Sequence, residues 1–146
     1  MKRDRIETSI GNYLTAVLLL SETDGEEQLV GTSILAKRLG VAPASVTQMI
    51  QKLAAKPYSL LLYKRSGGVR LSAGGKRVAL QQLRRHQLLC CYLFQELGLD
   101  RNDLHHEASL LAHHISLKFE ERLATKLGNP VVDPFGKNIP EPRSKF

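Results

Sequence analysis

The sequence of 146 residues predicts a mainly α fold with one small β-hairpin, because helical spacing of apolar residues dominates it and only one short stretch has a strand pattern. Residues 31–71 follow the order helix, turn, helix, strand, strand, which is that of a winged helix-turn-helix. Residues 76–127 are helical in pattern apart from one short break. We therefore expect a winged helix-turn-helix domain, residues 1–73, followed by a helical domain, residues 74–146.

The chain is expected to begin with an amphipathic helix over residues 4–20, followed by a polar turn over residues 21–30. The next helix, residues 33–39, also places its apolar side chains on one face, and Thr32 or Ser33 can cap its start. Apolar residues recur every three or four positions in both helices, as a face that packs on a core requires. These two helices would support the second helix of the helix-turn-helix.

That second helix is expected to begin at Pro43, since a proline has no N–H to leave unpaired at a first helical position. Apolar side chains recur on one face from Val46 to Leu53, and small polar side chains occupy the remainder of the helix surface. Two strands, residues 58–64 and 69–72, then flank a glycine-rich turn. They form the predicted wing, whose tip is basic.

The second half of the chain begins with a long predicted helix over residues 76–97, which Gly98 ends. Asn102 or Asp103 can cap another helix that continues to about residue 127, where a Gly-Asn-Pro sequence stops it. The tail that follows is expected to have no regular structure, because prolines and glycines interrupt it.

Positive charge is concentrated in the middle of the chain. Residues 28–95 contain no Asp or Glu, while the bases there are Lys37, Arg38, Lys52, Lys56, Lys64, Arg65, Arg70, Lys76, Arg77, Arg84 and Arg85. A region of one sign that coincides with a helix-turn-helix is suited to a phosphate backbone, so we expect DNA as the partner. A basic face that only meets solvent is the alternative. With no apolar run long enough to span a bilayer and no secretory signal, a cytoplasmic protein with no membrane partner is expected.

The only two cysteines, Cys90 and Cys91, are adjacent, which disfavours a disulfide between them and leaves buried thiols or a metal ligand. His86 lies one helical turn before Cys90, which would suit a nucleophile and its base. However, no Asp or Glu lies nearby in the sequence to orient His86, and the residues around Cys90 are apolar. We therefore expect that the protein is not an enzyme.

Several short motifs follow one another in a characteristic order: residues 13–14, 35–41, 45–53, 68–72 with Gly75, 85–86, 106–108, 113–116, 133–136 and 139–140. This series resembles the metal-dependent transcriptional repressors of the diphtheria-toxin-repressor and manganese-transport-regulator type, in their short, two-domain form. The resemblance implies a homodimer with a winged-helix domain and a helical dimerisation domain. It also implies that the dimer binds palindromic double-stranded DNA operators and represses metal-uptake genes when metal is bound.

The resemblance further implies which side chains contact DNA. Ala44, Ser45 and Gln48 would face the bases. The residues that would face the sugar-phosphate backbone are Thr32, Ser33, Thr47, Lys52 and the wing residues Lys64 and Arg65. The expected DNA-binding residues are Thr32, Ser33, Pro43, Ala44, Ser45, Thr47, Gln48, Lys52, Lys64 and Arg65.

The main metal site of that family is only partly represented in this chain. On the first helix the family has Met or Asp where this chain has Asn12, and some members have Glu where it has Thr15. On the late helix the family has Cys or Glu where this chain has Ser109, and Glu where it has Ala112. The family's His is present as His113, so only the histidine is retained. Mn²⁺ and Fe²⁺ sites depend on charged oxygen or thiolate donors, so we expect this site to be degraded.

The second metal site of the family is better preserved. By resemblance its ligands are His86, Cys90 and His105, and His113 is a candidate fourth donor. The family metals are Fe²⁺ and Mn²⁺, whereas Zn²⁺ or Fe²⁺ suits histidine and cysteine ligands better. The alternatives are that Cys90 is an ordinary buried residue and that the protein holds no metal.

We expect a dimeric, sequence-specific DNA-binding transcriptional regulator, a repressor related to the iron- and manganese-dependent regulators of metal homeostasis. Two alternatives stay open. One is a regulator that has lost metal control, and the other is a partner subunit that does not bind DNA and modulates a metal-competent relative. The basic helix-turn-helix and wing favour the DNA-binding protein, because a pure interaction module has no need of them.

Overall fold

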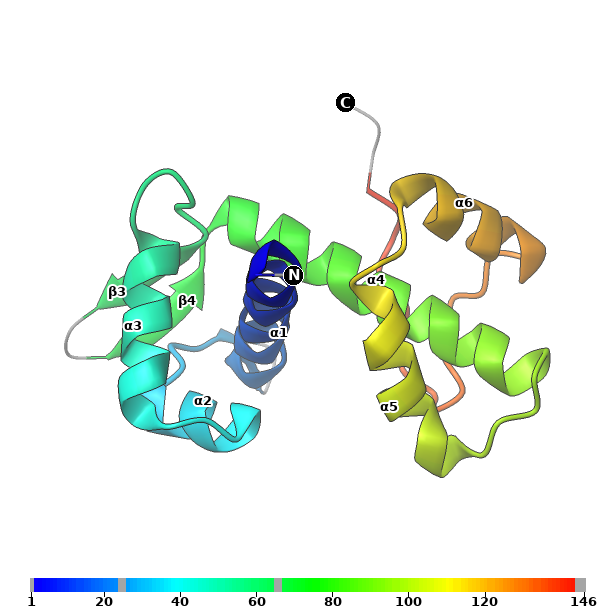
Figure 1. Ribbon diagram of the computed structural model, residues 1–146, viewed down its shortest axis with the longest axis horizontal. Coiled ribbons are helices and arrows are strands. Elements are labelled where there is room, and N and C mark those ends of the chain that lie inside the picture. The colour runs from blue at the N-terminus through cyan, green and yellow to red at the C-terminus, as the bar shows by residue number, and fades with distance from the viewer. Residues whose placement is uncertain (1, 24–25, 65–66, 144–146) are drawn as a thin grey trace. The chain divides into compact units, whose positions relative to one another are not determined.

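The computed structural model confirms the predicted mainly α fold with one hairpin wing (Figure 1). The residues that the structure describes are 2–23, 26–64 and 67–143. The chain forms two compact units, Met1–Leu80 and Gln81–Phe146, and helix α4 (Ala73–Gln95) runs from one into the other. Each unit buries its own set of apolar side chains. Among the described helices, none is both long enough and apolar enough to cross a membrane.

The first unit contains the winged helix-turn-helix. Its elements before α4 are α1 (Lys2–Ser21), β1 (Glu22–Thr23), β2 (Glu26–Glu27), α2 (Thr32–Leu39), α3 (Pro43–Ala54), β3 (Leu61–Lys64) and β4 (Gly68–Leu71). The apolar faces of the three helices form one core, in which Leu14, Leu35, Ile50 and Leu53 are fully buried. Burial of one face of α3 leaves the opposite face exposed to solvent.

The wing is an antiparallel pair of β3 and β4 that is hydrogen-bonded to both neighbouring segments. Val30, just before α2, exchanges two backbone hydrogen bonds with Val69 of β4, at 2.8 and 2.9 Å. At the base of the wing, the hydroxyl of Ser72 donates to Ser59 O at 2.8 Å and accepts from Gly75 N at 3.0 Å. The wing is therefore tied to the segment before α2 and to the start of α4.

Three local expectations for this unit are wrong in detail. Gly31, rather than Thr32 or Ser33, is the N-cap of α2, and no side chain caps it. The hydroxyl residues instead occupy the first two helical positions. The first wing strand begins at Leu61 rather than at residue 58, and the polar segment before α2 contains the short antiparallel pair of β1 and β2.

The second unit consists of most of α4, then α5 (Arg101–Ala112), α6 (Leu117–Lys126) and the tail. The single helix that we expected to continue to about residue 127 is wrong, because the chain leaves the helix after Ala112 and starts a new one at Leu117. Ser116 is the physical reason for the restart: its hydroxyl oxygen accepts a hydrogen bond from Phe119 N at 3.1 Å and so caps α6.

The cap of α5 also differs from the expectation. Asp100, rather than Asn102 or Asp103, is the N-cap, and its carboxylate accepts a hydrogen bond from Asn102 N at 3.1 Å. The described part of the tail, up to residue 143, has no helix or strand, but it packs closely. Ile139 is buried in the core of the unit, and Val132 forms an isolated β-bridge with Asn138.

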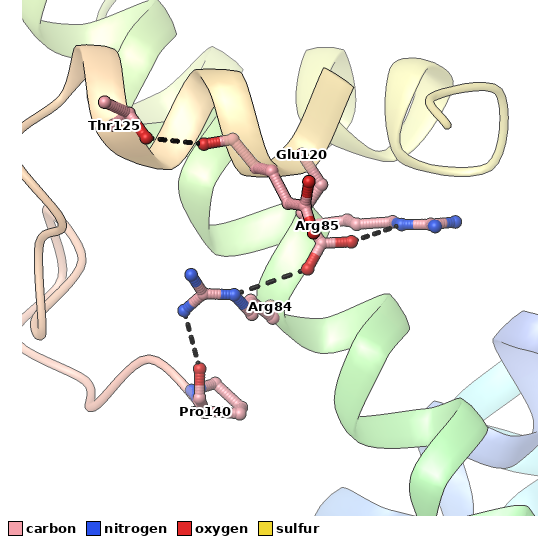
Figure 2. Close-up of polar contacts among 6 residues, drawn as sticks. Arg84, Arg85, Glu120, Thr125 and Pro140 are labelled. Carbon is pink, nitrogen blue, oxygen red and sulfur yellow. Dashed lines mark hydrogen bonds and ion pairs between the residues drawn. The ribbon is translucent and has the colours of Figure 1, made fainter. Parts of the chain in front are cut away.

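A buried carboxylate links α4 to α6. Glu120 is only 2% exposed, and two arginines of α4 converge on it (Figure 2). Arg85 Nε donates to Glu120 Oε2 at 2.8 Å, and Arg84 Nε lies 3.3 Å from Glu120 Oε1. Arg84 also donates from its terminal nitrogen to Pro140 O at 2.8 Å, so the same cluster holds the tail. The buried carboxylate is therefore compensated by two cations, as burial of a charge requires.

Replacing Glu120 by Gln should lower the free energy of unfolding by about 3 kcal/mol, because it leaves two partly buried arginines without their counter-ion. Its exposed neighbour provides a matched control, and Glu121→Gln should cost less than about 1 kcal/mol. Urea unfolding followed by circular dichroism measures both variants. Small and equal losses would contradict the role assigned to Glu120.

Candidate nucleic-acid interface and metal centre

Helix α3 presents most of the side chains that we expect to contact nucleic acid. Gln48 and Lys52 are exposed on this helix, and Pro43, Ala44 and Ser45 are exposed at its N-terminus. The first turn of α3 carries no acidic residue. The positive end of the helix dipole is therefore unopposed there, which favours a nearby anion. Small and amide side chains at this end of an exposed helix can approach base edges closely.

The side chains expected to contact the backbone lie on three elements. Ser33 is exposed and Thr32 is half-buried at the start of α2, and Lys64 is exposed at the end of β3. Thr47 is half-buried on α3, and its hydroxyl donates to a backbone carbonyl one turn earlier at 3.1 Å. Arg65 falls outside the described residues.

The second unit places His86 and Cys90 of α4 beside His105 of α5. One potential ligand atom from each residue lies within 4.8 Å of the other two, and this is the one such group of three found in the part of the chain that the structure describes. Cys90 is buried, His86 is half-buried and His105 is exposed. The group is therefore accessible to solvent from the side of His105.

Hydrogen bonding sets the orientation of His86. Its Nε2 lies 3.3 Å from the carbonyl oxygen of His105, and because a carbonyl can only accept, Nε2 carries the proton. Nδ1 then has a free lone pair, and it lies 3.8 Å from Cys90 Sγ. Histidines that bind metal commonly donate their other ring N–H to a carbonyl in this way. His86 is thus prepared to offer Nδ1 to a metal.

The three donors fit a soft divalent metal. Bonds of about 2.0–2.3 Å in a tetrahedral site separate the ligand atoms by about 3.3–3.8 Å. The separation of His86 Nδ1 and Cys90 Sγ is 3.8 Å, and all three ligand atoms are within 4.8 Å of one another. A small adjustment of the exposed His105 ring would complete the geometry. Three protein donors leave a fourth position for water or another ligand.

Burial determines the protonation of the group. Desolvation, together with smaller contributions from the nearby Asp133 and Cys91, raises the pKa of the Cys90 thiol to about 12. Desolvation also raises the pKa of Cys91 and lowers the pKa of His86. Near neutral pH the Cys90 thiol is therefore protonated and His86 is neutral. A metal that binds Cys90 has to displace its proton.

His113 lies outside this group. It follows the last residue of α5, and its Nδ1 lies 3.0 Å from Gln82 Nε2, while burial lowers its pKa. The two other late-helix positions of the expected main metal site carry no charged donor. Ser109 donates its hydroxyl to His105 O at 2.7 Å, and Ala112 is buried and has no donor atom in its side chain.

The remaining two positions of that site, Asn12 and Thr15, lie on α1 in the first unit. Asn12 is exposed. Thr15 is half-buried, and its hydroxyl oxygen is buried without a hydrogen-bond partner among the described residues. Neither side chain carries the negative charge on which sites for Mn²⁺ and Fe²⁺ depend.

The sequence reasoning missed two residues next to the group of His86, Cys90 and His105. The ring of Phe135 stacks on His105, with ring centroids 4.2 Å apart and planes within 8° of parallel. Asp133 acts electrostatically on both His86 and Cys90. Both belong to the Asp-Pro-Phe-Gly motif, which contributed only to the resemblance. The motif could have drawn attention to these two residues. Its contact with α5 could not be predicted, because it joins segments distant in the sequence and leaves no spacing pattern.

Two family models match this chain and together cover nearly all of it. Residues 5–69 match the model described as iron dependent repressor, N-terminal DNA binding domain. Residues 72–141 match the model described as iron dependent repressor, metal binding and dimerisation domain. The two matches meet close to the start of α4.

Curated relatives are similar over most of their length. The HTH-type transcriptional regulator MntR of Bacillus subtilis (strain 168) is 30% identical over 115 residues, which cover 79% of this chain and 77% of that protein. MntR of Listeria welshimeri is 32% identical over 133 residues, which cover 91% and 85%.

Solved structures are similar in fold as well as in sequence. A manganese-dependent transcriptional repressor in complex with manganese has a TM-score of 0.81 and 36% identity, over 90% of this chain and 58% of that chain. The manganese regulator SloR has a TM-score of 0.78 and 30% identity, over 91% and 60%. This chain therefore spans less than two thirds of the length of these solved chains.

The buried thiols should react slowly with iodoacetamide in the native protein. With a pKa of about 12 instead of 9.0, the thiolate fraction of Cys90 at mildly alkaline pH is lower by about a thousandfold. Both cysteines should react at ordinary rates in urea. Mass spectrometry of Cys90→Ser and Cys91→Ser variants separates the two thiols, and rapid labelling of Cys90 in the native chain would contradict its burial.

Proposed function

We infer the function of this chain from its family: it belongs to the iron-dependent repressor family, whose two domain models match residues 5–69 and 72–141. Its relatives are transcriptional regulators and not enzymes. We conclude that the chain is a metal-dependent helix-turn-helix transcriptional regulator of this type. The observation that best supports this conclusion is the combination, in one chain, of an exposed recognition helix in an acid-free basic region and a cluster of metal-binding side chains.

We assign DNA binding to residues 1–73, and dimerisation and metal binding to residues 74–146. In this proposal α3 enters the major groove with Ala44, Ser45 and Gln48 toward the bases. The other expected residues contact phosphates or shape the approach, namely Thr32, Ser33, Pro43, Thr47, Lys52, Lys64 and Arg65. A homodimer would present two such helices to a palindromic operator whose half-sites are about one helical turn apart.

For the metal, we propose that His86 Nδ1, Cys90 Sγ and a ring nitrogen of His105 are the ligands. Their proximity and the bond between His86 Nε2 and a backbone carbonyl support this assignment. One thiolate and two imidazoles suit Zn²⁺ or Fe²⁺ better than Mn²⁺, which prefers carboxylate and carbonyl oxygens. The repressor structure with manganese suggests that this would be a change of metal preference within the family.

The proposed regulation depends on how the chain joins α4 to α5. A bound metal supplies a cross-link between the two helices. Part of this connection exists without metal, because His86 donates a hydrogen bond to the backbone of α5. Cys90, one turn later on α4, is buried. A firmer contact between α4 and α5 would favour one conformation of the dimerisation domain, and hence one spacing of the two recognition helices.

A DNA-binding regulator without metal control is the second candidate. The uncharged residues at the family's main site favour it, namely Asn12, Thr15, Ser109 and Ala112. In that case side-chain packing alone must stabilise the conformation of the dimer that binds DNA. A partner subunit that does not bind DNA is disfavoured, because α3 keeps an exposed polar face in basic surroundings.

The DNA contacts are tested by two variants on the same helix. An operator is first selected from random DNA. Gln48→Ala should then lose about 1–3 kcal/mol of binding free energy on the operator and little on random DNA. Lys52→Ala should weaken binding to both DNAs equally, and it should reduce the slope of log affinity against log salt concentration by about 1. Fluorescence anisotropy at several salt concentrations measures both effects. Equal losses on both DNAs for Gln48→Ala would contradict the proposed orientation of α3.

Metal binding is tested by calorimetric titration of the full chain with Zn²⁺ in buffers of different ionisation enthalpy. We expect one Zn²⁺ per chain and release of about one proton near neutral pH, because the Cys90 thiol is protonated until it binds. Cys90→Ser should lose the proton release and most of the affinity. Cys91→Ser, which changes the adjacent buried thiol, should keep both. Zinc binding without proton release would exclude Cys90 as a ligand.

A further inference from the structure

A turn in the tail is held in one conformation by a single carboxylate. Asp133 is buried, and its Oδ1 accepts hydrogen bonds from Phe135 N at 2.8 Å and Lys137 N at 3.0 Å. Its Oδ2 accepts a hydrogen bond from Gln87 Nε2 at 2.9 Å. Gln87 follows the proposed ligand His86 on α4. The turn is therefore fixed to the helix that carries two of the three metal-binding side chains.

Two further hydrogen bonds anchor the same turn. Gln87 Nε2 also donates to Asn138 O at 3.1 Å, on the far side of the turn. Arg101 Nε, at the start of α5, donates to Pro134 O at 3.4 Å. The turn is thus attached both to α4 and to α5, the two helices between which the proposed metal site lies.

The turn places an aromatic ring against the metal-binding group. The ring of Phe135 lies flat on His105, with centroids 4.2 Å apart and an angle of 8° between planes. His105 also stacks on His86, with centroids 5.4 Å apart and an angle of 15°. Although His105 is an exposed residue, its ring therefore contacts two other rings.

We propose that Phe135 is a positioning residue for the metal site, which holds the His105 ring so that one of its nitrogens stays within reach of Cys90 Sγ. This proposal rests on the proposed metal site. Without Phe135, His105 would be an exposed side chain with two rotatable bonds, and a metal would have to order it on binding at a cost in conformational entropy. With Phe135, the His105 side chain is already ordered when the chain folds. Metal binding then loses less conformational entropy.

The proposal is tested with three variants of the full chain. Phe135→Leu removes the stacked ring but keeps an apolar side chain, and Phe135→Tyr restores the ring. Phe119→Leu is the matched control, because it makes the same substitution in the same unit at an exposed ring of α6. Each variant is titrated with Co²⁺, whose thiolate charge-transfer band reports on Cys90, and its Zn²⁺ affinity is measured by competition with a chelator. NMR of the metal-free chain reports on the ring protons of His105.

We expect Phe135→Leu to lower Zn²⁺ affinity about 10-fold or more and to change the Co²⁺ spectrum, as loss of residues that orient a ligand commonly does. In the metal-free chain, the His105 ring protons should lose their upfield ring-current shift. Phe135→Tyr should restore all three properties, and Phe119→Leu should leave them unchanged.

Two other outcomes overturn the proposal in different ways. If the parent chain binds Co²⁺ and Zn²⁺ but Phe135→Leu behaves like Phe119→Leu, Phe135 does not position His105 and the metal site itself stands. If the parent chain binds neither metal while the His105 ring shift shows that the stack exists, the proposed metal site fails and the positioning role fails with it.

Discussion

One turn of α4, residues 84–87, determines how the second unit is assembled. Successive side chains on a helix point about 100° apart, so four consecutive polar residues reach different neighbours. The two arginines reach α6 and the tail, His86 reaches the backbone of α5, and Gln87 reaches the turn in the tail. Because each contact joins α4 to a segment distant in sequence, this turn fixes the relative positions of all three segments. The apolar core of the unit contains residues from the same helices and from the tail.

The proposed metal site follows from that arrangement. His86 belongs to the same turn, Cys90 lies one turn later, and His105 is brought to them by α5. The site is therefore supported on two sides before any metal binds, by the carbonyl that accepts from His86 and by the ring of Phe135. Its chemistry differs from that of a site for Mn²⁺, because a buried thiol replaces charged oxygen donors. The Cys90 thiol also makes metal affinity depend on pH, because the metal competes with its proton and the pKa of the thiol is about 12.

Much of this architecture could be predicted from local spacing. The helix-turn-helix follows from helical periodicity and Pro43, and the pairing of His86 with Cys90 follows from their separation by one turn. The break between α5 and α6 could not be predicted in the same way, because apolar residues continue at helical spacing through it while the cap at Ser116 is a single local signal. The contact of Phe135 with His105 was equally hidden, because it depends on where the tail returns after α6.

The most direct test of the account is the affinity of the protein for its selected operator at fixed salt, measured with chelator and then with Zn²⁺, Fe²⁺ or Mn²⁺. If the cluster on α4 and α5 controls DNA binding, Zn²⁺ or Fe²⁺ should raise the affinity by about 5- to 150-fold, the usual range of such coupling. Mn²⁺ should have a smaller effect, and Cys90→Ser should abolish the response without changing the affinity in chelator. Tight binding that is indifferent to every metal would contradict metal control through this cluster.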